Sequence, residues 1–209
     1  MPAFRLIHED PHLLVLDKPA GLLCVPGRGE DKQDCLSARA QARWPDALIV
    51  HRLDMATSGL VLMARSAAMQ RALGDAFAER RVDKRYEAVV DGQLPLSKDW
   101  SLIDAPLIAD WPRRPLQKID PAGKPSQTRW RALRHLDGAT HVELEPLTGR
   151  SHQLRVHLQA IGHPILGDAL YAPASVQAAA DRLLLHATAL SFRHPESDAR
   201  VDFASAAPF

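Results

Sequence analysis

Short apolar runs separated by turn residues recur along this chain, and they do not alternate regularly with helical patterns. Two such bursts, split by His-Glu-Asp-Pro, predict a hairpin-like start within residues 4–16. Further strands are predicted at 47–50, 60–64, 85–90, 127–133, 141–147 and 183–192. Because strands outnumber helices without a regular βαβ order, we expect an α+β fold, with a mostly antiparallel mixed central sheet flanked by helices and loops.

Three segments have helical signals. Residues 33–43 predict a short helix that stops at Trp44-Pro45. Ser66 can cap a helix running to about Arg81, and Ser151 can cap another that ends near Gly162. Residues 92–125 are rich in proline and tryptophan and poor in periodicity, so we expect a loop-heavy insertion there rather than a second domain.

Length and composition suit one compact domain spanning residues 1–209, with 46% hydrophobic residues. Two cysteines without metal-type spacing favour a reducing compartment. The start has no signal-peptide pattern, and no apolar run approaches the ~18 residues of a membrane span. We therefore expect a cytoplasmic monomer that does not associate with membranes.

The net charge of +1 by itself neither favours nor excludes a nucleic-acid partner. The basic residues are nevertheless unevenly placed, with clusters at 80–85 and at 113–118. These clusters could be RNA-contacting patches, or they could be ordinary solvated faces.

A polar segment, HRLDMATSG at 51–59, lies between two predicted strands and contains Asp54. A loop between strands can present a functional side chain from a rigid frame. Arg52 is close enough in sequence to favour the ionised carboxylate, which can act as a nucleophile or a general base. The alternative is a turn-forming aspartate with a structural arginine partner, and spacing alone does not decide between them.

The segment TGRSHQLRVH at 148–157 gathers polar residues at a predicted helix start. His152 and Arg155 are three residues apart and can share a polar face. Arg150 stands where free backbone N–H groups favour an anion such as a phosphate. The alternative is an amphipathic surface helix whose polar face is merely solvated.

No metal or organic cofactor is expected. His152 and His157 are five residues apart, so on a helix they point in different directions, and no cysteine accompanies them. No glycine-rich phosphate loop or dinucleotide fingerprint is present.

Four segments together resemble the RluA family of pseudouridine synthases, in the family's order and over nearly the whole chain. They are DKPAGLLCVPG at 17–27, HRLDMATSG at 51–59, KRYEAVVDG at 84–92 and TGRSHQLRVHLQAIGHPILGDALY at 148–171. The family commonly has Asn where Asp17 stands. GLLCVPGR and PLIADWPRRPLQK further resemble the subgroup that modifies uridines in stem-loops of transfer RNA and large-subunit ribosomal RNA. The resemblance implies a catalytic domain without the S4-type RNA-binding module of many relatives.

The resemblance also implies roles. Asp54 matches the catalytic aspartate, Tyr86 the tyrosine that stacks on the target base, and Arg155 the arginine that pairs with the aspartate. Without the resemblance, Tyr86 would be interpreted as a half-buried strand residue. Arg52 matches a residue expected to contact RNA near the flipped nucleotide. Further RNA contacts are expected from His51, Arg150, His152, Arg113, Arg114 and Lys118.

Three other functions remain open: an RNA-binding protein without catalysis, a metal-dependent hydrolase that uses the histidines, and the same isomerisation on a different RNA. Asp54 could attack the nucleoside or assist deprotonation at the sugar, and the sequence does not distinguish these two routes.

Overall fold

The computed structural model describes residues 4–209, which form two compact units. Unit 1 comprises the chain up to Lys84 together with Ala187–Pro208, and unit 2 comprises Arg85–His186 together with Phe209. The division falls inside two strands, β5 (Asp83–Asp91) and β11 (Leu185–Arg193). The assignment of residues 1–209 to a single domain stays a prediction.

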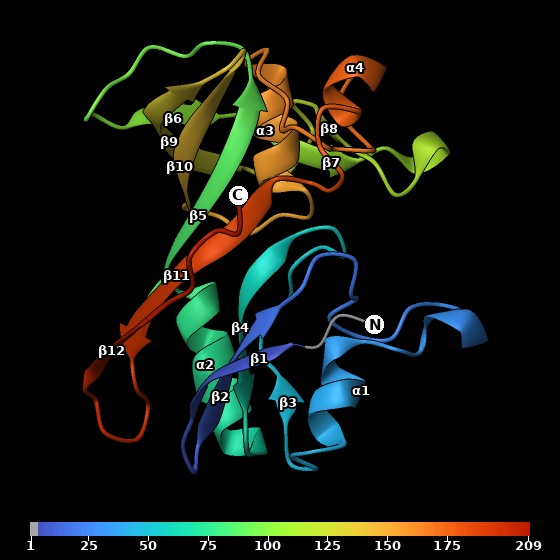
Figure 1. Ribbon diagram of the computed structural model, residues 1–209. Coiled ribbons are helices and arrows are strands. Elements are labelled where there is room, and N and C mark those ends of the chain that lie inside the picture. Colours follow the sequence, from blue (N-terminus) through green and yellow to red (C-terminus); the bar gives the residue numbers. More distant parts are fainter. Residues whose placement is uncertain (1–3) are drawn as a thin grey trace. The chain divides into compact units, whose positions relative to one another are not determined.

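Unit 1 is built on a sheet with the strand order β1-β2-β4-β11, in which β12 also pairs with β11 and β3 with β4 (Figure 1). Its other strands are β1 (Arg5–Glu9), β2 (Leu13–Lys18), β3 (Leu48–Ile49), β4 (Ser58–Ala64) and β12 (Arg200–Ala204). The pairs β1–β2, β2–β4, β3–β4 and β11–β12 are all antiparallel. The predicted hairpin-like start is confirmed as β1 and β2.

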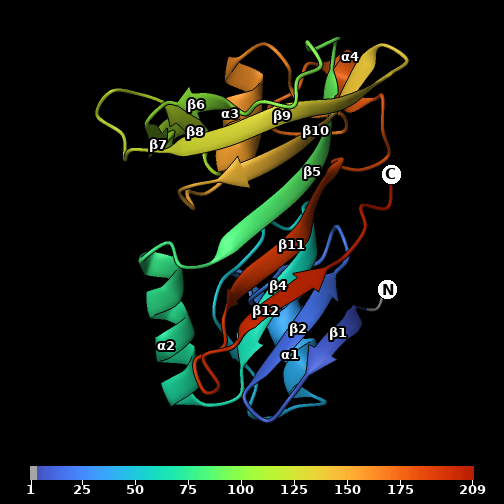
Figure 2. The ribbon, with the colours of Figure 1, turned by 90° about the vertical axis from the view of Figure 1, so that its left-hand side faces the viewer.

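Helix α2 (Ala67–Ala78) covers one face of this sheet (Figure 2). It begins after Ser66, whose side-chain oxygen accepts a hydrogen bond from the backbone N–H of Met69 at 3.1 Å, as predicted. Met69 and Leu73 on the helix pack with buried β4 and β11 side chains, including Leu62. The short helix α1 (Leu36–Gln41) lies within the predicted range 33–43, and the 3₁₀ turn η1 (Glu30–Lys32) precedes it.

Unit 2 has a sheet in the order β5-β10-β9-β6, with antiparallel pairs throughout. Its strands are β6 (Ser101–Asp104), β9 (Gln127–Leu136) and β10 (Ala139–Pro146), besides β5. A separate hairpin is formed by β7 (Leu107–Ala109) and β8 (Gln117–Ile119), which flank the 3₁₀ turn η2 (Trp111–Arg113). Two helices complete the unit, α3 (Gln153–Ala160) and α4 (Ala174–Gln177). Together with the sheet of unit 1, this confirms the predicted α+β class and the mostly antiparallel sheet.

Helix α3 differs from its prediction in two ways. It is capped by His152, which has a left-handed backbone with φ of 56°, and not by Ser151. All residues from Gln153 to Leu158 are buried, so the alternative of a surface helix with a solvated face is wrong. Within the described residues, no helix is long and apolar enough to cross a membrane.

Candidate active site

Asp54 lies on a loop of unit 1 whose backbone is held on both sides. The N–H of the preceding Leu53, which is buried, donates to the Cys24 sulfur at 3.2 Å. The carbonyl of the following Met55 accepts from the N–H of Gly21 at 2.8 Å. The Asp54 carbonyl itself accepts from the N–H of Thr57 at 3.1 Å. Because its neighbours are fixed in this way, the half-buried Asp54 is presented from a rigid loop.

A fully buried lysine ties the same loop to the end of β2. The Lys18 ammonium donates to the carbonyls of Pro19 at 2.8 Å, Leu22 at 2.7 Å and Met55 at 3.1 Å. Three acceptors match the three donors of an ammonium group, which compensates for its removal from water. This lysine is part of the motif at 17–27. Nothing in the sequence indicated that the lysine is buried or which carbonyl groups accept its hydrogen bonds.

The His51 side chain makes its contacts within unit 1. Its Nε2 accepts a hydrogen bond from the Leu62 N–H at 3.0 Å, and its ring stacks on Phe77 with centroids 4.5 Å apart. Burial, with a smaller contribution from the charge of Lys84, lowers the pKa of His51 from 6.5 to about 3, although the residue keeps some exposed surface. The ring is therefore a neutral packing element, and its predicted RNA contact stays a prediction. Arg52, by contrast, is exposed.

Tyr86 lies on β5 in unit 2, opposite Leu144 in the antiparallel pair with β10, and is half-buried. The structure thus confirms that it is a strand residue. Its predicted stacking on a base is a separate matter and stays a prediction.

Arg155 is buried in unit 2 and is held by a residue that was not among the predicted site residues, Asp168. Its Nε donates to one carboxylate oxygen at 2.8 Å, and a terminal nitrogen donates to the other at 2.6 Å. The two side chains are only 4% and 1% exposed. A two-point pair of this kind fixes the plane of the guanidinium group. Asp168 belongs to the GDALY end of the last quoted motif, which is the signal that could have identified it.

The backbone around Asp168 explains how this carboxylate is held. Its Oδ1 also accepts from the N–H groups of Leu170 at 2.9 Å and Tyr171 at 3.2 Å. Gly167, immediately before it, has a φ of +73°, and a Cβ there would lie 1.9 Å from the Arg182 carbonyl oxygen. Only glycine fits so close a backbone approach, so the turn that carries Asp168 requires it.

His152 and Tyr171 form a second contact beside this pair. The tyrosine hydroxyl lies 2.6 Å from His152 Nδ1 and accepts from the Gln117 N–H at 2.9 Å. The Arg155 guanidinium lies 5.0 Å from the centre of the tyrosine ring. The two residues at the helix start that were predicted to share a polar face, His152 and Arg155, thus both contact Tyr171.

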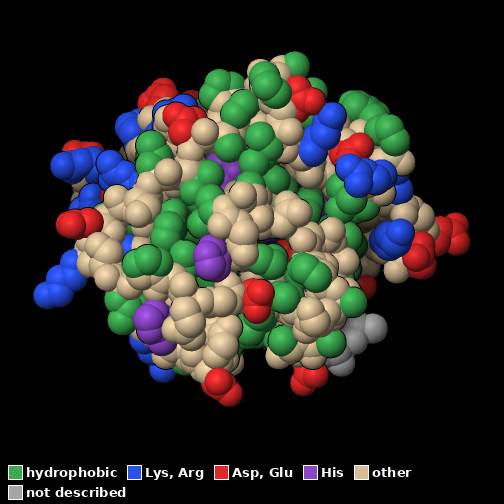
Figure 3. Space-filling view, turned by 90° about the horizontal axis from the view of Figure 1, so that it is seen from above, with side chains coloured by type: hydrophobic (Ala, Val, Ile, Leu, Met, Phe, Trp, Pro, Cys, Tyr) green, Lys and Arg blue, Asp and Glu red, His purple; other side chains and the backbone are tan. Residues whose placement is uncertain are grey.

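The predicted RNA-contacting residues of the 113–118 cluster lie on and beside the β7–β8 hairpin. Arg113 pairs with Asp110, Arg114 stacks over the ring of Trp111, and Lys118 pairs with Asp120. Arg150 is exposed and donates to the Pro125 carbonyl at 3.3 Å. The face in Figure 3 shows Lys and Arg side chains mainly toward its edges, with acidic side chains near several of them. Charge on this face is therefore mixed rather than gathered in one basic patch.

Two histidines of unit 2, His157 and His163, lie within hydrogen-bond distance of other protein groups. His157 lies within hydrogen-bond distance of Thr128 Oγ1 through Nδ1 (2.9 Å) and of the Ala105 carbonyl through Nε2 (3.0 Å). His163 Nδ1 lies 2.7 Å from the Asp91 carbonyl. Across residues 4–209, no group of three or more His, Cys, Asp or Glu side chains has an arrangement suited to a metal ion.

Comparison with known proteins identifies the class of protein to which this chain belongs. The family model for RNA pseudouridylate synthase matches residues 12–160, a range that includes Asp54, Tyr86 and Arg155. A solved human structure, RNA Pseudouridylate Synthase Domain Containing 1, has a TM-score of 0.82 and 29% identity, covering 99% of this chain and 84% of that one.

Two bacterial relatives narrow the class further, and both are named Dual-specificity RNA pseudouridine synthase RluA. The Yersinia pestis protein is 48% identical over 98% of this chain and 99% of its own length. The Escherichia coli K12 protein is 46% identical over 100% of this chain and 95% of its own. This chain belongs to the RluA family of RNA pseudouridine synthases, which isomerise uridine in RNA.

Proposed function

We propose that this enzyme has dual specificity and converts uridine to pseudouridine in stem-loops of both transfer RNA and large-subunit ribosomal RNA. The observation that carries the proposal is the identity of 46–48% to two enzymes named for dual specificity, over nearly the full length of each. We further propose that it acts as a monomer in the cytoplasm, where both RNAs are found.

In the proposed reaction the target uridine first leaves its stack, which costs a few kcal/mol and least in a loop. Tyr86 stacks on the flipped base, and base–aromatic stacking is worth about 1–3 kcal/mol. The bond from C1′ to N1 breaks, the base turns, and a bond from C1′ to C5 forms. The hydrogen at C5 leaves as a proton, and N1 ends with one proton more. No group is imported, and nothing is oxidised.

Asp54 is the proposed catalytic carboxylate, either as the nucleophile or by assisting deprotonation at the sugar. The fixed loop supports this role, because a reacting group gains most when it is held in one orientation. Arg155, oriented by Asp168, is proposed to pair with the ionised Asp54 in the working enzyme and to keep it charged.

Tritium release tests the proposal. Unmodified transfer RNA and a ribosomal RNA stem-loop carrying 5-tritiated uridine are each incubated with wild-type enzyme and with Asp54→Asn. We expect wild-type enzyme to release tritium from both RNAs and Asp54→Asn to release none while still binding them. Release from only one RNA would refute dual specificity, and equal release by Asp54→Asn would refute the assigned role of Asp54.

Arg155→Ala is expected to lose activity chiefly in the chemical step, measured as the single-turnover rate with saturating RNA. A rate near that of wild type would refute the proposed pairing with Asp54. Circular dichroism and thermal unfolding are needed beside it, because the change also leaves Asp168 buried without this cation.

A further inference from the structure

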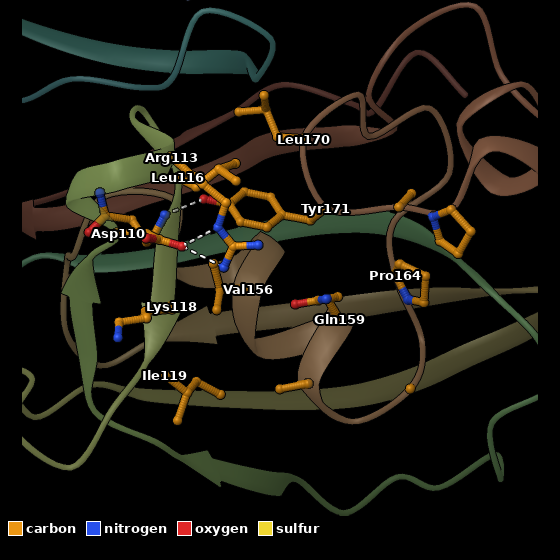
Figure 4. Close-up of a pocket in the computed structure, with 15 residues that line it drawn as sticks. Asp110, Arg113, Leu116, Lys118, Ile119, Val156, Gln159, Pro164, Leu170 and Tyr171 are labelled. Carbon is orange, nitrogen blue, oxygen red and sulfur yellow. Dashed lines mark hydrogen bonds and ion pairs between the residues drawn. The ribbon is translucent and has the colours of Figure 1, made fainter.

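A hollow of about 690 Å³ opens on unit 2, and all the residues that line it belong to that unit. Figure 4 shows that its walls come from the β7–β8 hairpin, helix α3 and the segment around Tyr171. Its volume lies within the ~300–1,000 Å³ typical of ligand pockets. Leu116, Val156 and the Tyr171 ring supply apolar surface, and Ile119 and Leu170 are still 41% and 37% exposed. Part of the wall is therefore apolar and accessible to the flat face of a ligand.

The charges around the hollow favour an anionic ligand. Arg113 and Lys118 both line it, with side chains 72% and 48% exposed. Their carboxylate partners are more deeply placed, because Asp110 is 8% and Asp120 is 31% exposed. Asp110 lines the hollow as well, but its side chain is nearly buried, so the exposed charge at the hollow comes mainly from Arg113 and Lys118. An exposed guanidinium in such a pair can still donate outward to a phosphate.

The turn next to the hollow carries an aromatic surface. Trp111 is 67% exposed, and the Arg114 guanidinium lies 3.1 Å from the centre of its ring. Exposed aromatic side chains beside cations are typical of sites that bind single-stranded nucleic acid, where bases stack and phosphates are neutralised. This surface points to a nucleic-acid occupant rather than an apolar small molecule or a protein.

The hollow also has a physical route to the proposed catalytic arginine. Tyr171 lines it, and the tyrosine ring lies 5.0 Å from the Arg155 guanidinium. The tyrosine hydroxyl accepts from the N–H of Gln117, on β8. A ligand that contacts Tyr171 and the hairpin would therefore be separated from Arg155 by a single side chain.

We propose that this hollow binds a second, unmodified nucleotide of the substrate RNA, one that is unstacked from the same loop as the target uridine. This inference rests on the proposed function. The base lies against Leu170 and Tyr171, and the phosphate is bound by Arg113 and Lys118. The exposed amide of Gln159, which lines the hollow, offers both a donor and an acceptor to the edge of the base. The site would thus contribute to the choice of loop sequence.

A double-mutant cycle between protein and RNA tests the proposal. The protein variants are Leu170→Ala and a matched control, Leu102→Ala, which removes a leucine that is 55% exposed on β6 and does not line the hollow. The RNA variants carry one abasic nucleotide at each loop position in turn, with the target uridine retained. Equilibrium binding and tritium release are measured for every combination.

We expect one loop position at which removing the base weakens binding to wild type roughly tenfold. At that position Leu170→Ala should add little further loss, whereas Leu102→Ala should behave as wild type. Independent effects of Leu170→Ala and of every abasic change, with normal tritium release by wild type, would overturn the subsite and leave the enzymatic function standing. Absence of tritium release by wild type from intact RNA would instead refute the proposed function and the subsite with it.

Discussion

Arg155 and Asp168 form a pair that is nearly inaccessible to water, and such a pair contributes orientation more than stability. Moving the two charged groups out of water costs several kcal/mol for each group. The attraction between them offsets this cost and adds little net stability. Asp168 also binds two backbone N–H groups, so the carboxylate cannot follow if the arginine moves. The arginine is thus held in one orientation before any RNA arrives.

Asp168→Asn should therefore impair both folding and catalysis. Asparagine keeps the shape but leaves the guanidinium buried without that anion, which should lower the unfolding free energy by about 3 kcal/mol. We expect a single-turnover rate at least tenfold lower with saturating RNA, with a smaller change in RNA affinity. Urea unfolding and rapid-quench kinetics measure the two effects.

Asp198→Asn is the control, because Asp198 is 85% exposed and its pair with Arg193 is solvated. It should leave stability and rate almost unchanged. If Asp168→Asn matched this control in rate, Asp168 would be a structural residue only.

His51 makes stability depend on pH in a definite direction. Its pKa is lowered to about 3 in the folded protein, whereas the unfolded chain takes up a proton near pH 6.5. Stability is therefore fully present above pH 6.5 and is lost as the pH falls toward 3. Between pH 6.5 and 5 the loss attributable to His51 should be about 1–2 kcal/mol.

His51→Gln isolates this contribution. The glutamine oxygen can accept the Leu62 N–H as the imidazole does, but it does not titrate. Urea unfolding at pH 6.5 and pH 5 should show a shallower decrease for His51→Gln than for wild type. Identical decreases would show that the imidazole is protonated without cost in the folded state.

At the scale of elements, the long strands and the capped helix were predictable because their signals are local. Alternation and apolar runs mark β4, β9 and β10, and the Ser66 side chain caps α2 as its position indicates. The strands β6, β7, β8 and β12 were missed because runs of three to five residues show too little periodicity. Helix α3 was misjudged because polar residues normally face water, and here Gln153, Arg155 and His157 are buried by tertiary partners.

For the site, as for the helices and strands, the sequence could indicate only what local sequence signals carry. Asp54 and Arg155 could be named as expected site residues because the motifs that resemble the family are contiguous in sequence, and their roles stay predictions. Lys18 and Asp168 were not named as site residues, because their importance depends on carbonyls and an arginine that are brought to them by folding.

Gln153 shows how the start of α3 is held, and it yields a prediction for the element. Its side-chain oxygen accepts from Thr148 Oγ1 at 2.7 Å and from the Arg150 N–H at 3.0 Å. Its nitrogen donates to the Gln127 carbonyl at 2.9 Å and to Thr128 Oγ1 at 3.0 Å. Gln153→Ala leaves buried polar groups unpaired and should cost on the order of 2 kcal/mol in unfolding free energy.

Gln159→Ala is the matched control on the same helix, because Gln159 is exposed. It should change the unfolding free energy by less than about 0.5 kcal/mol. Equal losses in the two variants would mean that the buried bonds of Gln153 contribute nothing beyond helix propensity.

For the whole molecule, a net charge of +1 means that RNA affinity must depend on where the cations lie rather than on their total. The double variant Arg113→Gln/Lys118→Gln should weaken RNA binding and reduce the slope of log affinity against log salt by about 1–2. Filter binding between 50 and 300 mM salt measures the slope.

A second double variant, Arg193→Gln/Arg200→Gln, removes the same charge from exposed positions of unit 1. It should leave the slope unchanged if the hairpin cations contact phosphates. Equal reductions in slope would show that binding responds only to overall charge.

The division of the chain inside β5 and β11 has a consequence for how the protein is made. Unit 2 is nearly one continuous segment, whereas unit 1 needs residues after 186 to complete its sheet. Leu190 and Phe192 of β11 are part of the core that Leu60, Leu62 and α2 contribute early in the chain. During synthesis on the ribosome, the hydrophobic core of unit 1 therefore stays incomplete until β11 and β12 have been made. Unit 2 can fold before that point.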